Sequence, residues 1–200
     1  AGVNHNGDLS MAERLVDAAA EAGVDAIKFQ TFKAERLLTA HASKAEYQLA
    51  VTSPTESQLD MLRRLELSPE AHTRLRDYTS RKGLVFLSSP FDEESADFLH
   101  GLGVPLFKIA SGELTNLPFL EHVARKGKPM IVSTGMAFLR EVEEALNAVR
   151  KAGGTEVVLL HCTSDYPANP SDCNLRAMVH MRETFNVPVG YSDHTAGLCV

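Results

Sequence analysis

Residues 106–113, LFKIASGE, show the pattern that decides the fold. A short apolar run carries one lysine, Lys108, and then ends in a serine and a carboxylate, Ser111 and Glu113. Similar runs occupy residues 26–30, 84–88, 130–134, 157–162 and 187–192. Because these runs are nearly continuously apolar rather than alternating, they are typical of strands that are buried on both faces of a parallel sheet.

Amphipathic stretches separate these runs and begin with residues that commonly cap helices. We expect helices after Ser10, Ser68, Asp92 and Asn116, and over residues 138–151 and 172–183. Residues 33–57 follow no clear period, and we expect a long loop there that can include one helical turn.

The alternation of strands and helices predicts an α/β fold with a parallel sheet, for which two architectures compete. An open dinucleotide-binding sheet calls for a G-x-G-x-x-G turn after an early strand, and the sequence has none. A (β/α)8 TIM barrel instead gathers polar side chains at the C-terminal ends of many strands, which favours the barrel here. The polar residues at the ends of the six runs are Lys28, Gln30, Thr31, Ser88, Ser89, Lys108, Ser111, Glu113, Ser133, Thr134, His161, Thr163, Ser164, Ser192, Asp193 and His194.

The number of predicted strands is seven rather than eight. Residues before Asn4 have the pattern of the end of one further strand, and no eighth strand precedes Val200. The chain also lacks an initiator methionine. We therefore expect residues 1–200 to form a single partial barrel domain that is truncated at both ends.

The composition excludes several classes of protein. The 200 residues are 44% hydrophobic and 23% charged, and no apolar run approaches the roughly 18 residues of a membrane span. A net charge of −6 argues against a nucleic-acid partner, whose binding surface is usually basic. Cys162, Cys173 and Cys199 lack C-x-x-C spacing, so neither a disulfide framework nor a zinc site is expected, and a cytoplasmic location is favoured.

Two lysines within apolar runs, Lys28 and Lys108, suggest a bound anion. A single such lysine can equally extend its ammonium group to solvent or form a salt bridge. Two of them on parallel strands, beside many hydroxyls, favour phosphate, because ammonium and hydroxyl groups suit its acceptor oxygens. The hydroxyls are those of Ser88, Ser89, Ser111, Ser133, Thr134, Thr163 and Ser164, although each of them can also cap the next helix.

A second group of residues suggests a metal ion and a proton-transfer group. His194 follows Asp193 at a strand end, where a neutral imidazole is a common ligand for Mn²⁺ or Zn²⁺, although a buried histidine is often purely structural. His161 is a second candidate ligand or base, and His5 can equally cap its own loop. Glu113 can bind hydroxyls or move a proton, or it can simply complement a helix N-terminus.

Seven segments taken together resemble the sialic acid synthase family, which includes N-acetylneuraminate synthases and their legionaminic and pseudaminic acid relatives. They are GVNHNG (2–7), KFQT (28–31), FLSSPF (86–91), FKIASGE (107–113), STGM (133–136), HCTSDYP (161–167) and GYSDHT (190–195). They occur in order along nearly the whole chain. The resemblance implies a (β/α)8 barrel followed by a small antifreeze-like domain, which residues 1–200 do not include, and a domain-swapped homodimer.

The resemblance also implies an activity, namely condensation of phosphoenolpyruvate with an N-acetylated hexose and water. The hexose would be N-acetylmannosamine or a diacetamido hexose, and the products a nonulosonic acid and phosphate released by C–O cleavage. The divalent metal would be Mn²⁺, with Mg²⁺ or Co²⁺ as alternatives.

The same resemblance assigns roles to individual residues. By this correspondence Glu113 and Tyr166 contact the sugar, His194 is one metal ligand, and Glu113 and Lys108 are the catalytic candidates. Some members of the family have Thr at the position of Ser89 and Asn at the position of Ser164. The family's second histidine ligand and one glutamate fall outside residues 1–200. The residues that would hold phosphoenolpyruvate are Lys28, Ser89, Lys108, Ser111, Ser133 and Ser164.

Two other readings stay open. A class I aldolase or lyase on the same barrel would form a Schiff base at Lys28 or Lys108. A non-catalytic fragment would bind phosphoenolpyruvate without turning it over.

Overall fold

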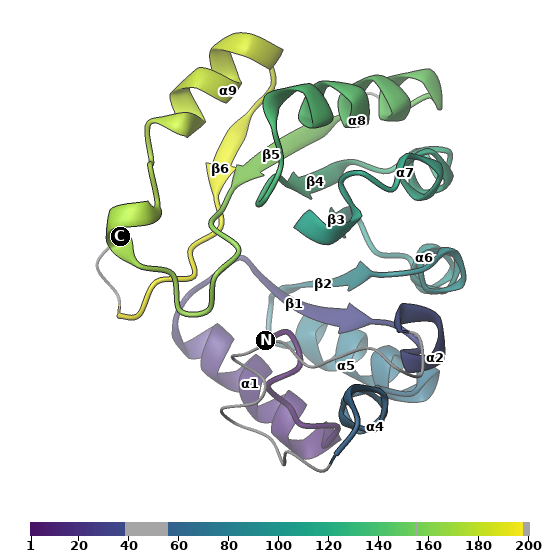
Figure 1. Ribbon diagram of the computed structural model, residues 1–200. Coiled ribbons are helices and arrows are strands. Elements are labelled where there is room, and N and C mark those ends of the chain that lie inside the picture. Colours follow the sequence, from purple (N-terminus) through teal and green to yellow (C-terminus); the bar gives the residue numbers. More distant parts are fainter. Residues whose placement is uncertain (39–55, 155, 198–200) are drawn as a thin grey trace. The chain divides into compact units, whose positions relative to one another are not determined.

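The computed structural model describes residues 1–38, 56–154 and 156–197, in which parallel strands alternate with helices (Figure 1). Contacts between Cα atoms divide the chain into two compact units, Ala1–Val104 and Pro105–Val200. The central part of the predicted loop, residues 39–55, and Cys199 lie outside the described residues.

The first unit is built on two parallel strands, β1 (Ala26–Thr31) and β2 (Val85–Pro90). Their register pairs Ala26 with Val85 and Thr31 with Pro90. Gly2 adds an isolated parallel bridge to Phe29, so the strand end expected before Asn4 is confirmed as a single bridge. The Phe29 ring stacks on Phe86 with a centroid distance of 5.8 Å, and burial of each ring contributes about 2 kcal/mol.

Five helices lie in the described part of the first unit, residues 1–38 and 56–104. In this unit α1 contacts α5, while α5 and α6 pack against β2 (Figure 1). The short helix α2 confirms the helical turn expected within residues 33–57, whereas α4 was not predicted. Their bounds are α1 (Leu9–Glu21), α2 (Ala34–Leu37), α4 (Gln58–Arg63), α5 (Pro69–Arg81) and α6 (Glu93–Leu102).

Helix caps explain where these helices begin. Ser68 Oγ accepts the Ala71 N–H at 3.2 Å, and the Asp92 carboxylate accepts the Ser95 N–H at 2.8 Å, as predicted. The predicted cap of α1 was wrong, because Asp8 rather than Ser10 takes this position. The Asp8 carboxylate accepts the backbone N–H of Ser10 at 2.7 Å, and an aspartate is at least as good an N-cap as a serine.

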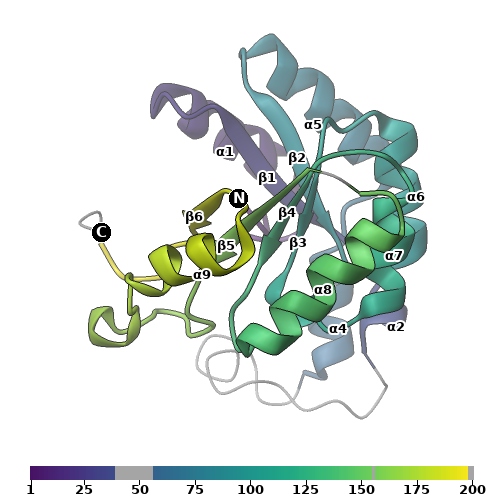
Figure 2. The same cartoon turned by 90° about the horizontal axis from the view of Figure 1, so that it is seen from above.

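The second unit contains a four-stranded parallel sheet in the order β3-β4-β5-β6. The strands are β3 (Phe107–Ile109), β4 (Met130–Ser133), β5 (Val157–His161) and β6 (Val189–Tyr191). Three helices, α7 (Leu117–Ala124), α8 (Leu139–Lys151) and α9 (Ala177–Phe185), accompany it. Helices α7 and α8 pack against each other, and α9 packs on β5 and β6 (Figure 2).

Two sequence predictions for this fold need correction. The helix expected over residues 172–183 begins only at Ala177, and a separate 3₁₀ turn covers Pro170–Asp172. Asn174 lies between them with φ of 42°, a left-handed conformation that interrupts a helix. Burial on both faces holds for β3, but in β1 Ile27, Phe29 and Thr31 are buried while the alternate residues are only half-buried.

The predicted α/β class with a parallel sheet is confirmed by all six strands that the structure describes. None of the described helices combines the length and the apolar character that crossing a membrane requires.

Candidate functional site

Side chains from the ends of two strands gather around Gly135, which follows β4 in the second unit. A Cβ atom on Gly135 would lie 2.3 Å from Ser164 Oγ, 2.9 Å from Ser111 Oγ and 3.0 Å from Cys162 Sγ. Ser111 comes just after β3, while Cys162 and Ser164 come just after β5. Only glycine leaves room for such close approach, so this position is needed for the cluster to form. We call these four residues the Gly135 cluster.

The hydroxyl of Ser111 is held at two points within the Gly135 cluster. Its Oγ accepts the backbone N–H of Gly135 at 3.0 Å and lies 3.2 Å from Cys162 Sγ. Cys162 and Gly135 are buried, while Ser111 and Ser164 are half-buried. The cluster therefore presents two partly accessible hydroxyls on a fixed base.

Lys108 and Ser133 belong to the same sheet as the Gly135 cluster. Lys108 lies within β3 with only 8% of its surface exposed, and its ammonium donates to the Ile109 carbonyl oxygen at 2.7 Å. Ser133 is the last residue of β4 and is 3% exposed. Thr134, also a predicted anion ligand, instead donates its hydroxyl proton to the Leu160 carbonyl at 3.1 Å.

In the first unit, the sheet register separates the predicted residues onto two faces. Lys28 pairs with Leu87, and Gln30 pairs with Ser89. Because side chains alternate along a strand, Lys28, Gln30 and Ser89 share one face. Burial lowers the pKa of Lys28 below its ordinary value. Ser89 is buried on this face, beside the predicted lysine.

Ser88 lies on the opposite face and is already engaged. Its Oγ is 2.7 Å from Thr31 Oγ1, which in turn is 2.8 Å from Nε2 of His72 on α5. All three side chains are buried. Of the two adjacent serines, Ser89 therefore shares the face of the sheet that carries Lys28, and Ser88 does not.

His194 and Tyr166, which the sequence places 28 positions apart by number, lie side by side, with a ring-centroid distance of 4.5 Å. His194 Nδ1 is 2.8 Å from the Thr163 carbonyl oxygen. A carbonyl only accepts, so Nδ1 carries the proton and Nε2 keeps its lone pair. The Nε2 atom lies 3.4 Å from Ser192 Oγ. This arrangement, with one nitrogen fixed by a carbonyl, is typical of metal-binding histidines.

Among the described residues, the predicted ligand His194 is not part of a cluster that could hold a metal ion. In residues 1–38, 56–154 and 156–197, no three His, Cys, Asp or Glu side chains lie close enough together to hold an ion. The neighbouring Asp193 carboxylate accepts the N–H of Thr195 at 2.9 Å and its hydroxyl at 3.1 Å. His194 Nε2 therefore stays a candidate metal ligand that has no companion ligands beside it among the described residues.

The other candidate polar residues have local partners. The half-buried Glu113 accepts a hydrogen bond from Asn116, the N-cap of α7, at 2.9 Å. His161 Nε2 donates to the Cys173 carbonyl at 2.6 Å. His5 is fully buried, and its Nδ1 accepts the Gly7 N–H at 3.0 Å, which confirms the reading of His5 as the cap of its own loop.

A groove of about 620 Å³ in the second unit is lined by Cys162 and Ser164, but not by the other two members of the Gly135 cluster. Its lining also includes the carboxylates of Asp165 and Asp172 and apolar side chains, of which Met136 and Phe138 are 76% and 77% exposed. The groove therefore joins hydrogen-bonding groups to an apolar surface, a combination suited to a polar ligand with small apolar substituents.

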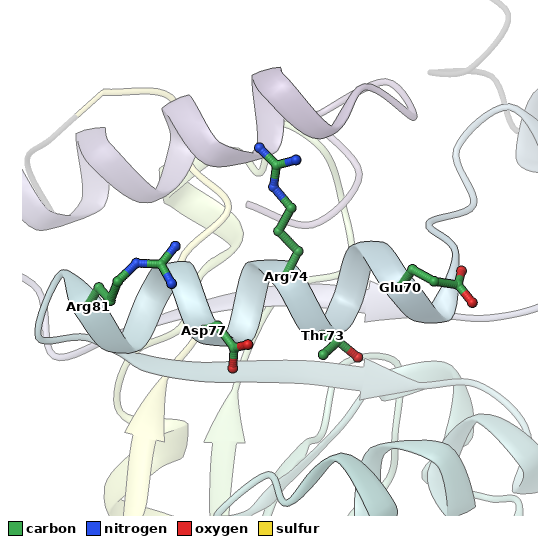
Figure 3. Close-up of a pocket in the computed structure, with 5 residues that line it drawn as sticks. All are labelled: Glu70, Thr73, Arg74, Asp77 and Arg81. Carbon is green, nitrogen blue, oxygen red and sulfur yellow. The ribbon is translucent and has the colours of Figure 1, made fainter.

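A hollow of a different kind lies in the first unit on helix α5 (Figure 3). Arg74 extends from it towards α1, where its Nε donates to Glu13 at 2.7 Å. None of the predicted site residues lines this hollow, whose residues are Glu70, Thr73, Arg74, Asp77 and Arg81.

Sequence reasoning assigned no role to Gly135 or Cys162, although both lie in quoted segments. A glycine directly after a Ser-Thr strand end was the available signal for Gly135, since close packing at strand ends often requires glycine. Nothing in the sequence pointed to Cys162, because its contact with Ser111 joins residues that are far apart in the chain.

The chain is similar to known proteins along nearly its whole length. The model of the NeuB family matches residues 15–200. The chain is 50% identical over 200 residues to the N,N'-diacetyllegionaminic acid synthase of Campylobacter jejuni, covering 99% of this chain and 60% of that protein. It is 51% identical over 204 residues to the synthase of the same name from Legionella pneumophila, covering 100% and 57%. The chain thus spans less than two thirds of the length of these relatives.

A solved structure is similar to this fold. The N-acetylneuraminic acid synthetase of Leptospira borgpetersenii, solved in complex with citrate, matches with a TM-score of 0.86 and 34% identity. The match covers 98% of this chain and 64% of that protein. Together with the alternating parallel strands and helices, it confirms the predicted (β/α)8 barrel class.

Proposed function

The chain belongs to the NeuB family, and from this premise we propose that the complete protein condenses phosphoenolpyruvate with an N-acetylated hexose. Water is the third reactant, and the products are a nonulosonic acid and inorganic phosphate. Relatives that carry synthase names support this proposal at the level of the reaction class.

The observation that carries the proposal is the Gly135 cluster. It places the hydroxyls of Ser111 and Ser164 beside Gly135, whose backbone N–H is bonded to Ser111 Oγ, in a sheet that also contains the buried side chain of Lys108. Hydroxyl and ammonium donors together suit the oxygens of a phosphoryl group. Lys28, Ser89 and Ser133 are proposed as phosphoenolpyruvate ligands on the family resemblance alone.

In the proposed reaction, C3 of phosphoenolpyruvate forms a bond to the aldehyde carbon of the open-chain hexose. The electron pair comes from the enol double bond, and the aldehyde oxygen takes up a proton to become a hydroxyl. C2 becomes an oxocarbenium centre, to which water adds with loss of a proton. The resulting tetrahedral centre loses phosphate as its C–O bond breaks. Lys108 and the two serines stabilise the phosphate oxygens as negative charge moves onto them.

The sugar would lie beside this anion site. Glu113 and Tyr166 are proposed to contact it, and Glu113 could also move a proton there. When bound through His194 Nε2, a divalent ion, Mn²⁺ in the family that the sequence resembles, would supply polarisation of the aldehyde oxygen. The two relatives near 50% identity both make a diacetylated product by name, so we propose a diacetamido hexose as the substrate.

The proposal is tested by measuring phosphate release by the complete protein. Phosphoenolpyruvate is supplied with Mn²⁺ and, in turn, with N-acetylmannosamine or diacetamido hexoses. We expect phosphate and a nonulosonic acid in equal amounts, with the diacetamido substrate preferred. Absence of phosphate release with every hexose contradicts the proposal, and binding of phosphoenolpyruvate without turnover supports the non-catalytic reading. We also propose that the complete protein is a homodimer, which its mass in solution tests. A cytoplasmic location is a further proposal, which fractionation of cells tests.

One observation favours a second candidate function. Burial lowers the pKa of Lys28, as expected for a lysine that forms a Schiff base in an aldolase. Reduction with borohydride in the presence of pyruvate would then attach the substrate to Lys28. A protein that releases phosphate and forms no such adduct supports the synthase.

A further inference from the structure

We propose that Cys162 is a positioning residue whose thiol directs the hydroxyl proton of Ser111 towards a bound phosphoryl oxygen. This inference rests on the proposed function, because it concerns the same anion site. Neither the sequence pattern nor the relatives assign a role to this cysteine.

The Ser111 hydroxyl can make only a small number of hydrogen bonds. A serine hydroxyl has one proton to donate and two lone pairs with which to accept. One lone pair takes the Gly135 N–H at 3.0 Å. The remaining contact, at 3.2 Å, is with Cys162 Sγ, and either atom can be the donor.

These two choices have different consequences for an anion. If Ser111 donates to the sulfur, its single proton is used and the hydroxyl has none for a ligand. If Cys162 donates, both lone pairs of Ser111 are filled and its proton must point elsewhere. Because the unprotonated oxygens of a phosphoryl group only accept, a phosphoryl group bound to Ser111 through one of them selects the second arrangement.

The exchange between the two arrangements needs only bond rotation. The Cys162 S–H turns towards Ser111 Oγ while the Ser111 O–H turns away, and each proton stays on its own atom. A thiol is a weak donor and a weak acceptor, so neither arrangement is strongly held. When no ligand is bound, Ser111 can thus donate its proton to Cys162. When the anion is bound, Cys162 donates instead and Ser111 donates its proton to the anion.

The surroundings fix both residues for this task. Cys162 is 6% exposed, and a Cβ on Gly135 would lie 3.0 Å from its sulfur. The same position would be 2.9 Å from Ser111 Oγ. The sulfur and the hydroxyl are therefore held against one glycine, which leaves little room for either to move out of contact.

The first test uses three variants of the complete protein and inorganic phosphate as the probe. Cys162→Ala removes the donor, whereas Cys162→Ser keeps one. We expect Cys162→Ala to weaken phosphate binding about tenfold and to raise the KM for phosphoenolpyruvate equally, with the KM for the hexose unchanged. Cys162→Ser should restore both values to within about threefold of the unmodified protein.

Cys173→Ser is the matched control in this unit. Cys173 is also buried, but its sulfur donates to the Asn169 carbonyl at 3.5 Å, and it has no contact with Ser111 among those that the structure shows. We expect phosphate binding to be unchanged in this variant. Equal losses in Cys162→Ala and Cys162→Ser, or an equal rise in the KM for the hexose, would overturn the positioning role.

A second measurement does not depend on a folded alanine variant. The infrared S–H stretch of Cys162, identified as the band missing from Cys162→Ser, reports whether the thiol donates a hydrogen bond. We expect phosphate to shift this band to lower frequency in the unmodified protein. An unmoved band with phosphate bound contradicts the inference.

The two proposals fail in different ways. If the unmodified protein binds no phosphate and releases none, the proposed function is wrong. If it binds phosphate with the same affinity in all Cys162 variants, only the role of Cys162 is wrong.

Discussion

Thr31 Oγ1 lies 2.8 Å from His72 Nε2, and this contact joins the end of β1 to helix α5 in the first unit. Its direction follows from the other nitrogen of the ring. His72 Nδ1 is 2.9 Å from the Ser68 carbonyl, which only accepts, so Nδ1 carries the proton and Nε2 accepts from Thr31. Ser88 then donates to Thr31 at 2.7 Å. A directed chain of hydrogen bonds thus fixes the face of β1 and β2 opposite to Lys28 and Ser89.

Removing the hydroxyl at the middle of this chain should be costly. Thr31→Val leaves both Ser88 Oγ and His72 Nε2 without this partner in a buried position, and we expect a loss of about 2–3 kcal/mol in the free energy of unfolding. Thr31→Ser keeps the hydroxyl and deletes one methyl group, so it should cost about 1 kcal/mol. Urea unfolding of the two variants makes the comparison, and similar losses would show that the hydroxyl chain contributes little.

The buried ring of His72 predicts a pH dependence. Burial lowers its pKa from the ordinary value of 6.5, and the nearby charge of Lys33 acts in the same direction. The unfolded chain therefore binds more protons than the folded one below about pH 6.5, so stability is full above this value and falls as the pH decreases. We expect the urea concentration at the unfolding midpoint to decrease as the pH is lowered from 7 to 5.

The matched variants for this pH dependence are His72→Gln and His100→Gln. The first should flatten the fall in the urea midpoint, because it removes the titrating ring. A residual slope is expected from His5, whose pKa is also lowered by burial and by His72. His100 is exposed, so its replacement should leave the slope unchanged. A slope that is the same in His72→Gln would contradict the assignment.

Lys108 should act on the anion and not on the sugar. Lys108→Met keeps most of the side-chain volume but removes the ammonium, and a hydrogen bond to a charged group contributes about 1.5–3 kcal/mol. We expect the KM for phosphoenolpyruvate to rise about 10- to 100-fold, while the KM for the hexose stays within about twofold. Lys151→Met, on the exposed end of α8, is the control and should behave as the unmodified protein. Equal effects on both substrates would exclude this role for Lys108.

The strands and the chemistry of their ends could be predicted because each run carries its own signal. Residues 106–113 and 157–162 show buried strands followed by polar groups, and the structure places strands within both segments. Helix ends were harder to predict, since Asp8 and Ser10 are both acceptable caps and only the folded backbone chooses between them. The start of α9 was missed because the left-handed conformation of Asn174 leaves no pattern in the sequence.

The site was predictable as a set of residues but not as a geometry. Ser88 and Ser89 look alike in the sequence, and only the strand register shows that they point to opposite faces. The Gly135 cluster depends on contacts between residues up to 51 positions apart by number, Ser111 and Cys162, which no local pattern encodes. Family resemblance named the serines, while their common support on Gly135 became visible only in the folded chain.

His194 should bind metal through Nε2, because the Thr163 carbonyl fixes the proton on Nδ1. We expect EDTA to abolish phosphate release by the complete protein and Mn²⁺ to restore it. His194→Ala should weaken Mn²⁺ binding at least tenfold, measured by calorimetry, with a smaller effect on the binding of inorganic phosphate. The control is His180→Ala, a change in an exposed residue of α9. Full activity after complete removal of divalent ions would rule out the metal.

Gly135→Ala tests the centre of the proposed anion site. The added methyl would lie 2.3 Å from Ser164 Oγ, well inside van der Waals contact, and would also press on Ser111 and Cys162. The two serines must then move apart, and because a displacement of about 1 Å can cost 10²-fold in rate, we expect kcat/KM for phosphoenolpyruvate to fall at least 100-fold. Gly101→Ala is the matched control, since nothing lies within 4 Å of a Cβ at that helical position and alanine favours helix. Steady-state kinetics of both variants make the comparison, and near-normal kinetics in Gly135→Ala would show that the phosphoryl group binds elsewhere.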